Sequence, residues 1–164
     1  KRDSFYLNEG GNSFSKLPID FINLFNIKPD EENWFNTYTA AATGDINNDG
    51  FEDTVVFQPH VGLIYSLLSK PNNNSWIGFK LEGTVSNRDA IGTRIDLTSG
   101  GTTQTKTVTA GSSFLAQNSK RQIFGLNQSK EIEKVLITWP NGNTQTLINI
   151  EVSKMHQITQ ETND

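Results

Sequence analysis

After Trp76, apolar residues alternate with polar residues or glycine in two short stretches. A period of two places apolar side chains on one face of a β-strand, so each stretch is expected to be a half-buried strand. The alternation is found at residues 77–82 and 94–98, and further strands are predicted at 104–109, 134–139 and 144–148. Turn residues separate them, such as Ser99-Gly100-Gly101 and Pro140-Asn141-Gly142. The pattern predicts an all-β region that forms a small β-sandwich.

The first 75 residues are less regular, and we expect them to form a separate region. A glycine- and asparagine-rich stretch at 8–12 predicts a hairpin turn between two short strands. Apolar residues at helical spacing predict one short helix near 19–26. The asparagine-rich segment Pro71–Ser75 is typical of a linker. We therefore predict one domain at 1–75, a second at 76–160 and a tail at 161–164.

Composition excludes several kinds of site. The 164 residues include no cysteine, which excludes disulfides, thiol catalysis, zinc–thiolate sites and iron–sulfur clusters. The net charge is −4 with both signs interspersed, so a basic face for nucleic acid is not expected. No apolar run approaches the ~18 residues of a membrane helix, so we expect no membrane span.

One polar loop carries most of the chemical information in the sequence. Between predicted strands at 40–43 and 54–57, side-chain oxygens recur at alternating positions, and a backbone carbonyl can serve a fifth position. The five predicted ligands are Asp45, Asn47, Asp49, the Phe51 carbonyl and Asp53. Calcium takes six to eight oxygens, and this spacing wraps a short loop around such an ion. The alternative is a solvated acidic turn without metal.

The loop differs from an EF-hand. Val56 stands where that motif has its twelfth-position Glu, and strand-forming residues follow the loop in place of a helix. We expect Ca²⁺ to bind in the weak range of extracellular modules, ~10⁻⁴–10⁻³ M. Such a site would be filled outside a cell, which favours export to a bacterial outer surface or periplasm.

Gly44–Asp53 resembles the calcium loop of FG-GAP (VCBS-type) repeats, which build integrin-like β-propellers. Residues 5–14 are similar to the tail of a preceding repeat. The resemblance implies that residues 1–75 are a terminal propeller-type unit, that further repeats lie upstream, and that the chain is the C-terminal fragment of a longer protein.

From Trp76 to about Thr159 the chain resembles the ASPIC/UnbV domain, which follows such repeats in bacterial exported proteins and in the cartilage acidic protein family. Ala90 stands where that family often has glycine. The resemblance implies architecture and export more than a particular activity. The matching stretches are residues 86–94, 110–118, 124–126 and 139–142.

Two polar loops are candidate ligand sites in this second region. Arginine side chains in such loops could bind carboxylates or sugar hydroxyls. The alternative is that these residues only fix the strand connections, and convergence of the two loops would favour the ligand site. The candidates are Asn87, Arg88, Asp89 and Arg94 in the first loop, and Ser112, Gln117 and Asn118 in the second.

No catalytic residues are predicted, and we expect the chain not to be an enzyme. Neither His60 nor His156 has a serine and an orienting acid in a recognisable arrangement. Trp76 and Trp139 are in phase with apolar neighbours on predicted strands, which favours positions in the core.

The leading hypothesis is a secreted or cell-surface binding or adhesion module, stabilised by calcium, that recognises a glycan or an extracellular protein. A second hypothesis is a structural cap of a β-propeller that binds nothing itself. A third is a fragment of a carbohydrate-active enzyme, which would need two carboxylates facing each other across a cleft.

Overall fold

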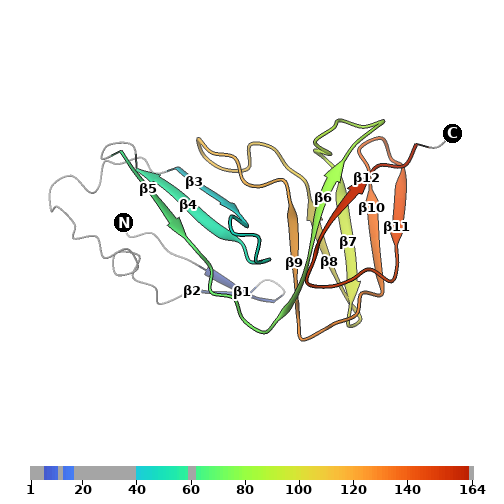
Figure 1. The fold of residues 1–164 in the computed structure, drawn as a ribbon, viewed down its shortest axis with the longest axis horizontal. Coiled ribbons are helices and arrows are strands. Elements are labelled where there is room, and N and C mark those ends of the chain that lie inside the picture. Colours follow the sequence, from blue (N-terminus) through green and yellow to red (C-terminus); the bar gives the residue numbers. More distant parts are fainter. Residues whose placement is uncertain (1–5, 11–12, 17–39, 59–61, 163–164) are drawn as a thin grey trace. The chain divides into compact units, whose positions relative to one another are not determined.

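The computed structural model describes residues 6–10, 13–16, 40–58 and 62–162. In these ranges the chain is all-β and contains no helix, so none that could cross a membrane. The helix predicted near 19–26 lies outside the described residues. The strands are β1 (Tyr6–Gly10), β2 (Ser13–Lys16), β3 (Ala40–Gly44), β4 (Asp53–Gln58), β5 (Leu63–Leu67), β6 (Ser75–Glu82), β7 (Arg94–Ser99), β8 (Thr102–Thr107), β9 (Gln122–Asn127), β10 (Lys134–Thr138), β11 (Thr144–Leu147) and β12 (Met155–Thr159) (Figure 1).

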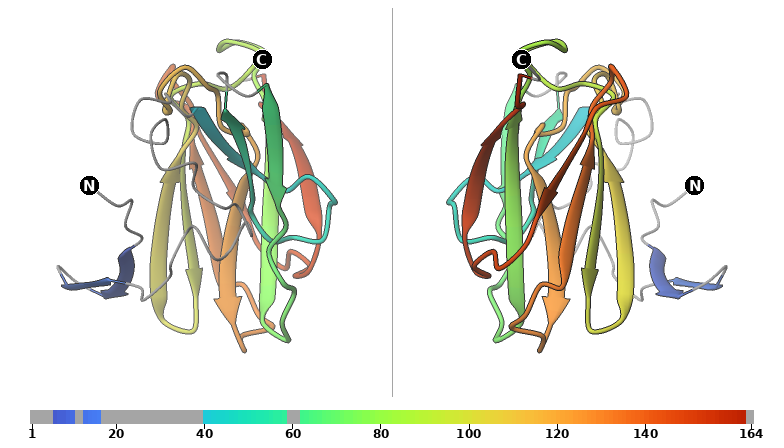
Figure 2. Two further views of the ribbon diagram at one scale, coloured as in Figure 1. Left: turned by 90° about the vertical axis from the view of Figure 1, so that its left-hand side faces the viewer. Right: turned by 90° about the vertical axis from the view of Figure 1, so that its right-hand side faces the viewer.

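Two sheets enclose one apolar core, and we call them together the sandwich. One sheet has the order β11-β10-β7-β8 and the other the order β12-β6-β9. Figure 2 shows that their strands run along nearly the same direction. Both sheets contribute to the core, which consists of Ile77, Phe79, Leu81, Ala90, Ile95, Leu97, Val108, Phe124, Leu126, Ile132, Val135, Ile137 and Trp139.

The alternation in the sequence explains this core. Ile77 and Phe79 are completely buried, whereas Lys80 is exposed. Across the other sheet, antiparallel pairing places Ile95 opposite Ile137, and both are buried. The strands predicted at 77–82, 94–98, 104–109, 134–139 and 144–148 are confirmed as β6, β7, β8, β10 and β11, with small differences at their ends.

The sequence reading missed β9 and β12. β12 pairs in parallel with β6, so that Met155 lies opposite Gly78, and the two arrows point the same way in Figure 1. The Met155 side chain occupies the space where a Cβ at position 78 would lie. Alternating residues alone could not reveal that β12 returns to the strand that begins the sandwich.

A buried glutamine fixes the end of β12. The Gln160 side chain is 3% exposed, and its Oε1 accepts hydrogen bonds from three consecutive backbone amides. The donors are the amides of Thr84, Val85 and Ser86, at 3.2, 3.2 and 2.8 Å. Gln160 Nε2 also donates to Asn141 Oδ1 at 3.2 Å. This amide therefore ties the segment after β6 to the segment after β12.

A third sheet, β3-β4-β5, precedes the sandwich and is antiparallel throughout. The predicted arrangement of strand, polar loop and strand is confirmed by β3 and β4, whereas β5 was not predicted. Val56 is its one buried apolar side chain among those described. The sheet does not close on itself, because β3 and β5 are its outer strands.

β1 and β2 form an antiparallel hairpin in which Tyr6 lies opposite Lys16, which confirms the two predicted strands. Of the predicted turn at 8–12, residues 8–10 belong to β1, and residues 11–12 lie outside the described ranges. The hairpin belongs to one unit of the chain, and the strands from β3 onward belong to another. The sheet β3-β4-β5 and the sandwich thus lie in the same unit. The domain boundary expected near Ser75 stays a prediction.

Candidate metal centre

The loop Asp45–Asp53 connects β3 to β4, and we call it the acidic loop. Its two ends are held together because Gly44 pairs with Asp53 in the sheet. Two residues bend it tightly: Asn48 has a φ of 60° and Gly50 a φ of 88°. Asparagine and glycine are the residues that adopt such left-handed conformations most readily.

Asp45 organises the interior of the acidic loop. Its side chain is only 9% exposed. One carboxylate oxygen accepts the amide of Asp49 and the other accepts the amide of Gly50, both at 3.0 Å. Charged acceptors strengthen such bonds, so Asp45 favours the wrapped form of the loop.

Asn47 and Asp49 lie on the exposed side of the same bend. Asn47 donates through Nδ2 to Asp49 Oδ2 at 2.8 Å, and its Oδ1 accepts the Asp49 amide at 3.2 Å. Asp49 Oδ1 accepts the amide of Phe51 at 2.9 Å. Three of the predicted ligand residues are thereby brought into direct contact with one another or with the loop backbone.

Asp53 is the most deeply buried charged residue described, with 1% of its surface exposed. Its Oδ2 accepts the amide of Ile46 at 2.9 Å, and its Oδ1 accepts the amide of Ser69 at 2.8 Å. Ser69 also donates through Oγ to the carbonyl of Glu52 at 2.6 Å. The sequence reading missed Ser69, which follows β5 and carries no motif.

Within the described residues, the three aspartates of the acidic loop have no ion-pair partner, whereas its exposed Glu52 lies 3.8 Å from Lys106. None of the ion pairs there involves Asp45, Asp49 or Asp53. A buried charge is costly unless it is paired, and two amide hydrogen bonds compensate for it only in part. The acidic loop therefore has the excess of negative charge that a cation would neutralise.

The donor set fits a hard cation in its chemistry, since every side-chain group is an oxygen donor of the kind that calcium binds. Each carboxylate oxygen has two lone pairs, so one that accepts an amide can also contact an ion. The side chains point to backbone amides and not to a common centre. Across the described ranges, no three His, Cys, Asp or Glu side chains form a metal-binding group.

In the first candidate ligand loop, at 86–94, the polar side chains do not converge on one site. Asn87 bonds the backbone of Ile91 twice, accepting from its amide at 2.8 Å and donating to its carbonyl at 2.9 Å. Ala90 is buried with a φ of 54°, which accounts for the preference for glycine at this position. These contacts stabilise the turn itself.

The charged residues of that loop each have a different partner. Arg88 lies 3.4 Å from Glu82 on the surface. Asp89 pairs with Lys120, whose hydrogen bond and charge lower the pKa of the Asp89 carboxyl. Arg88 and Asp89 thus have separate ion-pair partners.

Arg94 pairs with Asp96 at 2.8 Å, and Thr105 donates its hydroxyl to the same carboxylate. Partial burial by itself would raise the pKa of Asp96. The bonds from Thr105 and Arg94 outweigh that effect and lower the pKa. This cluster spans neighbouring strands β7 and β8 on the sandwich surface.

The second candidate loop, at 110–118, uses its polar side chains internally. Gln117 Oε1 accepts the amide of Gly111 at 2.9 Å, and Asn118 Nδ2 donates to Ser112 Oγ at 3.1 Å. No hydrogen bond or ion pair between described residues joins these three side chains to Asn87, Arg88 or Arg94. Lys120, just beyond, reaches the first loop through Asp89.

The same connection covers the outer edge of β3. Asn118 Oδ1 accepts the Thr43 amide at 3.0 Å, and the Ser119 amide donates to the Thr43 carbonyl at 2.8 Å. Ser113 donates through Oγ to the Ala41 carbonyl. The polar groups in this loop therefore replace a neighbouring strand along β3.

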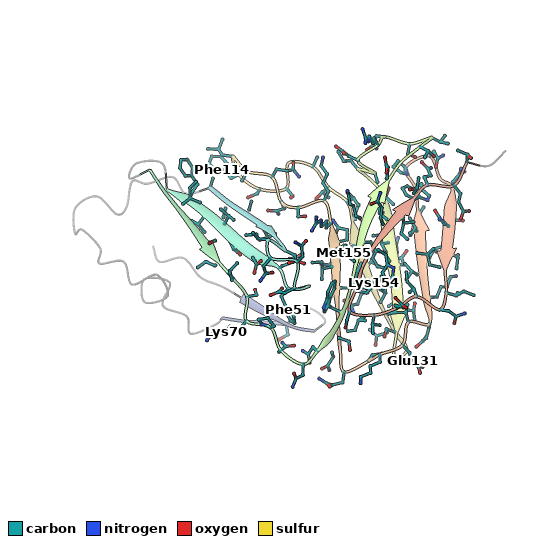
Figure 3. All side chains as sticks on the ribbon, in the orientation of Figure 1. Phe51, Lys70, Phe114, Glu131, Lys154 and Met155 are labelled. Carbon is teal, nitrogen blue, oxygen red and sulfur yellow. The ribbon has the colours of Figure 1, made fainter. Side chains whose placement is uncertain are left out.

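Exposed apolar side chains lie at the end of the β3-β4-β5 sheet farther from the acidic loop. Phe114 and Leu115 are 67% and 78% exposed, and Leu115 has a φ of 53°. Figure 3 shows Phe114 near the start of β3 and Phe51 near the opposite end of the sheet. Phe57 and Ile64 are cross-strand neighbours and are also exposed.

Trp139 lies in the core, as predicted, whereas the same prediction for Trp76 is wrong. Trp76 is half-buried, outside the core of the sandwich, and its indole lies against Gly50. On β6 the Trp76 side chain lies on the face opposite to Ile77 and Phe79, and it packs against the acidic loop.

A family model described as ASPIC and UnbV matches residues 83–164, which is half of the chain. No curated protein matches the sequence. The matched region contains β7 to β12. β6 ends just before it in the sequence, although in the sheet β6 lies between β9 and β12.

Proposed function

Because this chain belongs to the ASPIC and UnbV family by a match over half its length, we propose that it is a binding or adhesion module that calcium stabilises and that works outside the cell. Its partner is a glycan or an extracellular protein, and the module performs no catalysis. In this proposal the protein is secreted or held at the surface or in the periplasm of a bacterium.

The observation that carries the calcium proposal is the buried carboxylate of Asp53. It is 1% exposed, and no Lys, Arg or His side chain within the described residues pairs with it. Asp45, also buried, and Asp49 lie in the same nine-residue loop. Like charges this close repel one another, and a divalent cation converts that repulsion into attraction.

In this proposal the ion is held by the acidic loop, with oxygens from Asp45, Asn47, Asp49, the Phe51 carbonyl and Asp53. The ion supplies charge neutralisation and no reaction chemistry. Calcium is preferred to magnesium, because a flexible loop rich in carboxylates suits the larger ion. The protein side chains keep the loop wrapped, chiefly through the amides that Asp45 accepts.

We further propose that β3-β4-β5 is the end of a β-propeller-type repeat region and that more repeats lie upstream in the full protein. The supporting features are the open three-stranded antiparallel sheet and the acidic loop at its first turn. The outer strand β5 presents Ile64, which is 71% exposed. A further strand or repeat could cover this edge.

The exposed pair Phe114–Leu115 supports a binding role. Large apolar side chains in a polar loop are costly to leave in water, and such exposed groups often mark interaction sites. Leu115 also adopts a left-handed conformation, which strains a branched residue. Loop 110–118 is thus the part of the module that we expect to contact a partner.

The calcium proposal is tested by thermal unfolding in calcium and in chelator. Calcium is expected to raise the melting temperature of the parent protein, and Asp49→Ala is expected to remove most of that increase. Glu131→Ala, which removes an exposed carboxylate elsewhere, serves as the matched control and should keep the full response. If chelator and Asp49→Ala both leave the melt unchanged, the acidic loop holds no structural ion.

The binding proposal is tested with a glycan array and a panel of extracellular proteins in calcium. We expect a ligand whose binding is weakened by Phe114→Ser together with Leu115→Ser. The exposed edge of β5 favours one alternative, the structural cap of a propeller. Absence of any ligand across both panels would support the cap and contradict the binding module.

A further inference from the structure

Gly50 packs closely against Trp76, and this contact joins the acidic loop to the sandwich. A Cβ added to Gly50 would overlap the six-membered and five-membered rings of the Trp76 indole. Gly50 is buried and has a φ of 88°, a conformation that L side chains rarely adopt. Glycine is thus required here for two independent reasons, the bend and the indole.

Two polar contacts flank that packing. Arg121 donates through Nη1 to Asn48 Oδ1 at 2.7 Å, just before β9. Lys106, on β8, lies 3.8 Å from Glu52 and also 5.6 Å from the ring centre of Phe124. The acidic loop therefore contacts both sheets of the sandwich, through β6, β8 and the start of β9.

The position of Trp76 on β6 allows a conformational change of the acidic loop to affect the sandwich. It precedes Ile77, which is completely buried in the core. Its strand pairs with both β9 and β12, and its carbonyl accepts the amide of Ser153. A displacement of the indole would consequently disturb β6, the central strand of its sheet.

We propose that the contact between Gly50 and Trp76, which we call the joint, couples the stability of the acidic loop to that of the sandwich. Trp76 is the positioning residue. The wrapped loop stabilises the start of β6, and the indole in turn stabilises the wrapped loop. The effect on calcium binding rests on the function proposed above, whereas the coupling itself exists without an ion. Any ion held by the loop therefore stabilises the sandwich as well.

Hydrogen exchange of the full chain in chelator tests the coupling in the absence of calcium. Trp76→Ala should speed exchange of the Asp49 and Gly50 amides by about tenfold or more, because local opening of the loop becomes easier. Leu126→Ala removes a buried core side chain from the same sheet and serves as the control. It should leave those two amides unchanged, and equal acceleration by both variants would overturn the joint.

Trp76→Phe keeps an aromatic ring and guards against a variant that does not fold. We expect exchange of the two loop amides to be intermediate between that of the parent and that of Trp76→Ala. A folded Trp76→Phe and a folded Trp76→Ala that both exchange at the parental rate would contradict the proposal.

Calorimetric titration with calcium alone tests whether the contact between Gly50 and Trp76 affects calcium binding. Trp76→Ala should weaken calcium binding by roughly threefold to tenfold, the range of ordinary coupling between sites. If the parent shows no calcium binding but the exchange effect is present, the calcium proposal fails and the joint stands. If calcium binds parent and variant equally and exchange is also unaltered, the joint fails while the calcium proposal stands.

Discussion

The sheet β3-β4-β5 and the sandwich are stabilised in different ways, although they lie in one unit. In the sandwich, thirteen buried apolar residues from both sheets form a continuous core. In the three-stranded sheet, Val56 is the one buried apolar side chain described, and the other notable buried groups are the carboxylates of Asp45 and Asp53. Apolar burial does not depend on ions, whereas buried carboxylates depend on their partners. We therefore expect solution conditions to alter the stability of the three-stranded sheet more than that of the sandwich, which they affect only through the contact between Gly50 and Trp76.

The largest effect is expected from the core. Phe79 is completely buried and packs edge-on against Phe124, with ring centres 5.9 Å apart. Phe79→Ala should destabilise the sandwich by about 3–5 kcal/mol because it leaves a cavity. The loss, measured by urea unfolding, should be equal in calcium and in chelator. Phe114→Ala removes an exposed ring and should change stability by less than about 0.5 kcal/mol.

Asp53→Ala tests the same comparison in the three-stranded sheet, because it removes a buried carboxylate of that region. This change leaves the amides of Ile46 and Ser69 without acceptors, at a cost of about 1–3 kcal/mol. The loss should appear in hydrogen exchange of β3, β4 and β5 and should be much smaller in the core of the sandwich. Equal losses in both regions would show that they unfold as one and would remove the contrast.

A smaller effect is expected at the edge of β3. Asn118→Ala removes the acceptor of the Thr43 amide and should cost about 0.5–1.5 kcal/mol. Faster exchange of the Thr43 amide is the measurement. Asn118→Asp keeps an oxygen acceptor and should restore protection, whereas a ligand-binding role alone would not alter exchange at Thr43.

The smallest effect concerns pH and the sandwich surface. The pKa of Asp96 is lowered in the folded protein, so the unfolded chain binds a proton at this site more readily. Its contribution to stability is complete above the unfolded value, near 3.8, and is lost as pH falls through the folded pKa. Asp96→Asn should remove a small part of the acid-side decline in stability. Asp96→Asn and the parent should therefore differ at neutral pH and converge in acid.

Local patterns predicted much of this fold. Period-two alternation located β6 and β7, because one face of each strand is buried, and turn residues between short segments located β8, β10 and β11. β12 was missed because Met155, Gln157 and Thr159 make no apolar stripe, and its place is set by pairing with a strand far away in the sequence. Trp76 was wrongly placed in the core, since it alternates with Ile77 and therefore lies on the other face of β6, where its partner is the acidic loop.

The sequence predicted which residues form the candidate site, but it did not predict most of their hydrogen-bond partners. The spacing from Asp45 to Asp53 identified side chains that do lie in one loop between two strands. The amide of Ser69, which Asp53 accepts, comes from a segment without a motif. Likewise, Ser113 and Asn118 bond the backbone of β3, a contact that only the folded chain reveals.

The parallel pairing of β12 with β6 also bears on how the chain is made. Contacts such as that between Thr84 and Gln160 join residues 76 positions apart. At a synthesis rate of ~5–20 residues per second, the ribosome would deliver β12 about 4 to 15 seconds after β6. Throughout that interval one edge of β6 is open to strands of neighbouring nascent chains. Slower elongation would lengthen this period, so the yield of correctly folded protein should respond to translation speed as well as to thermodynamic stability.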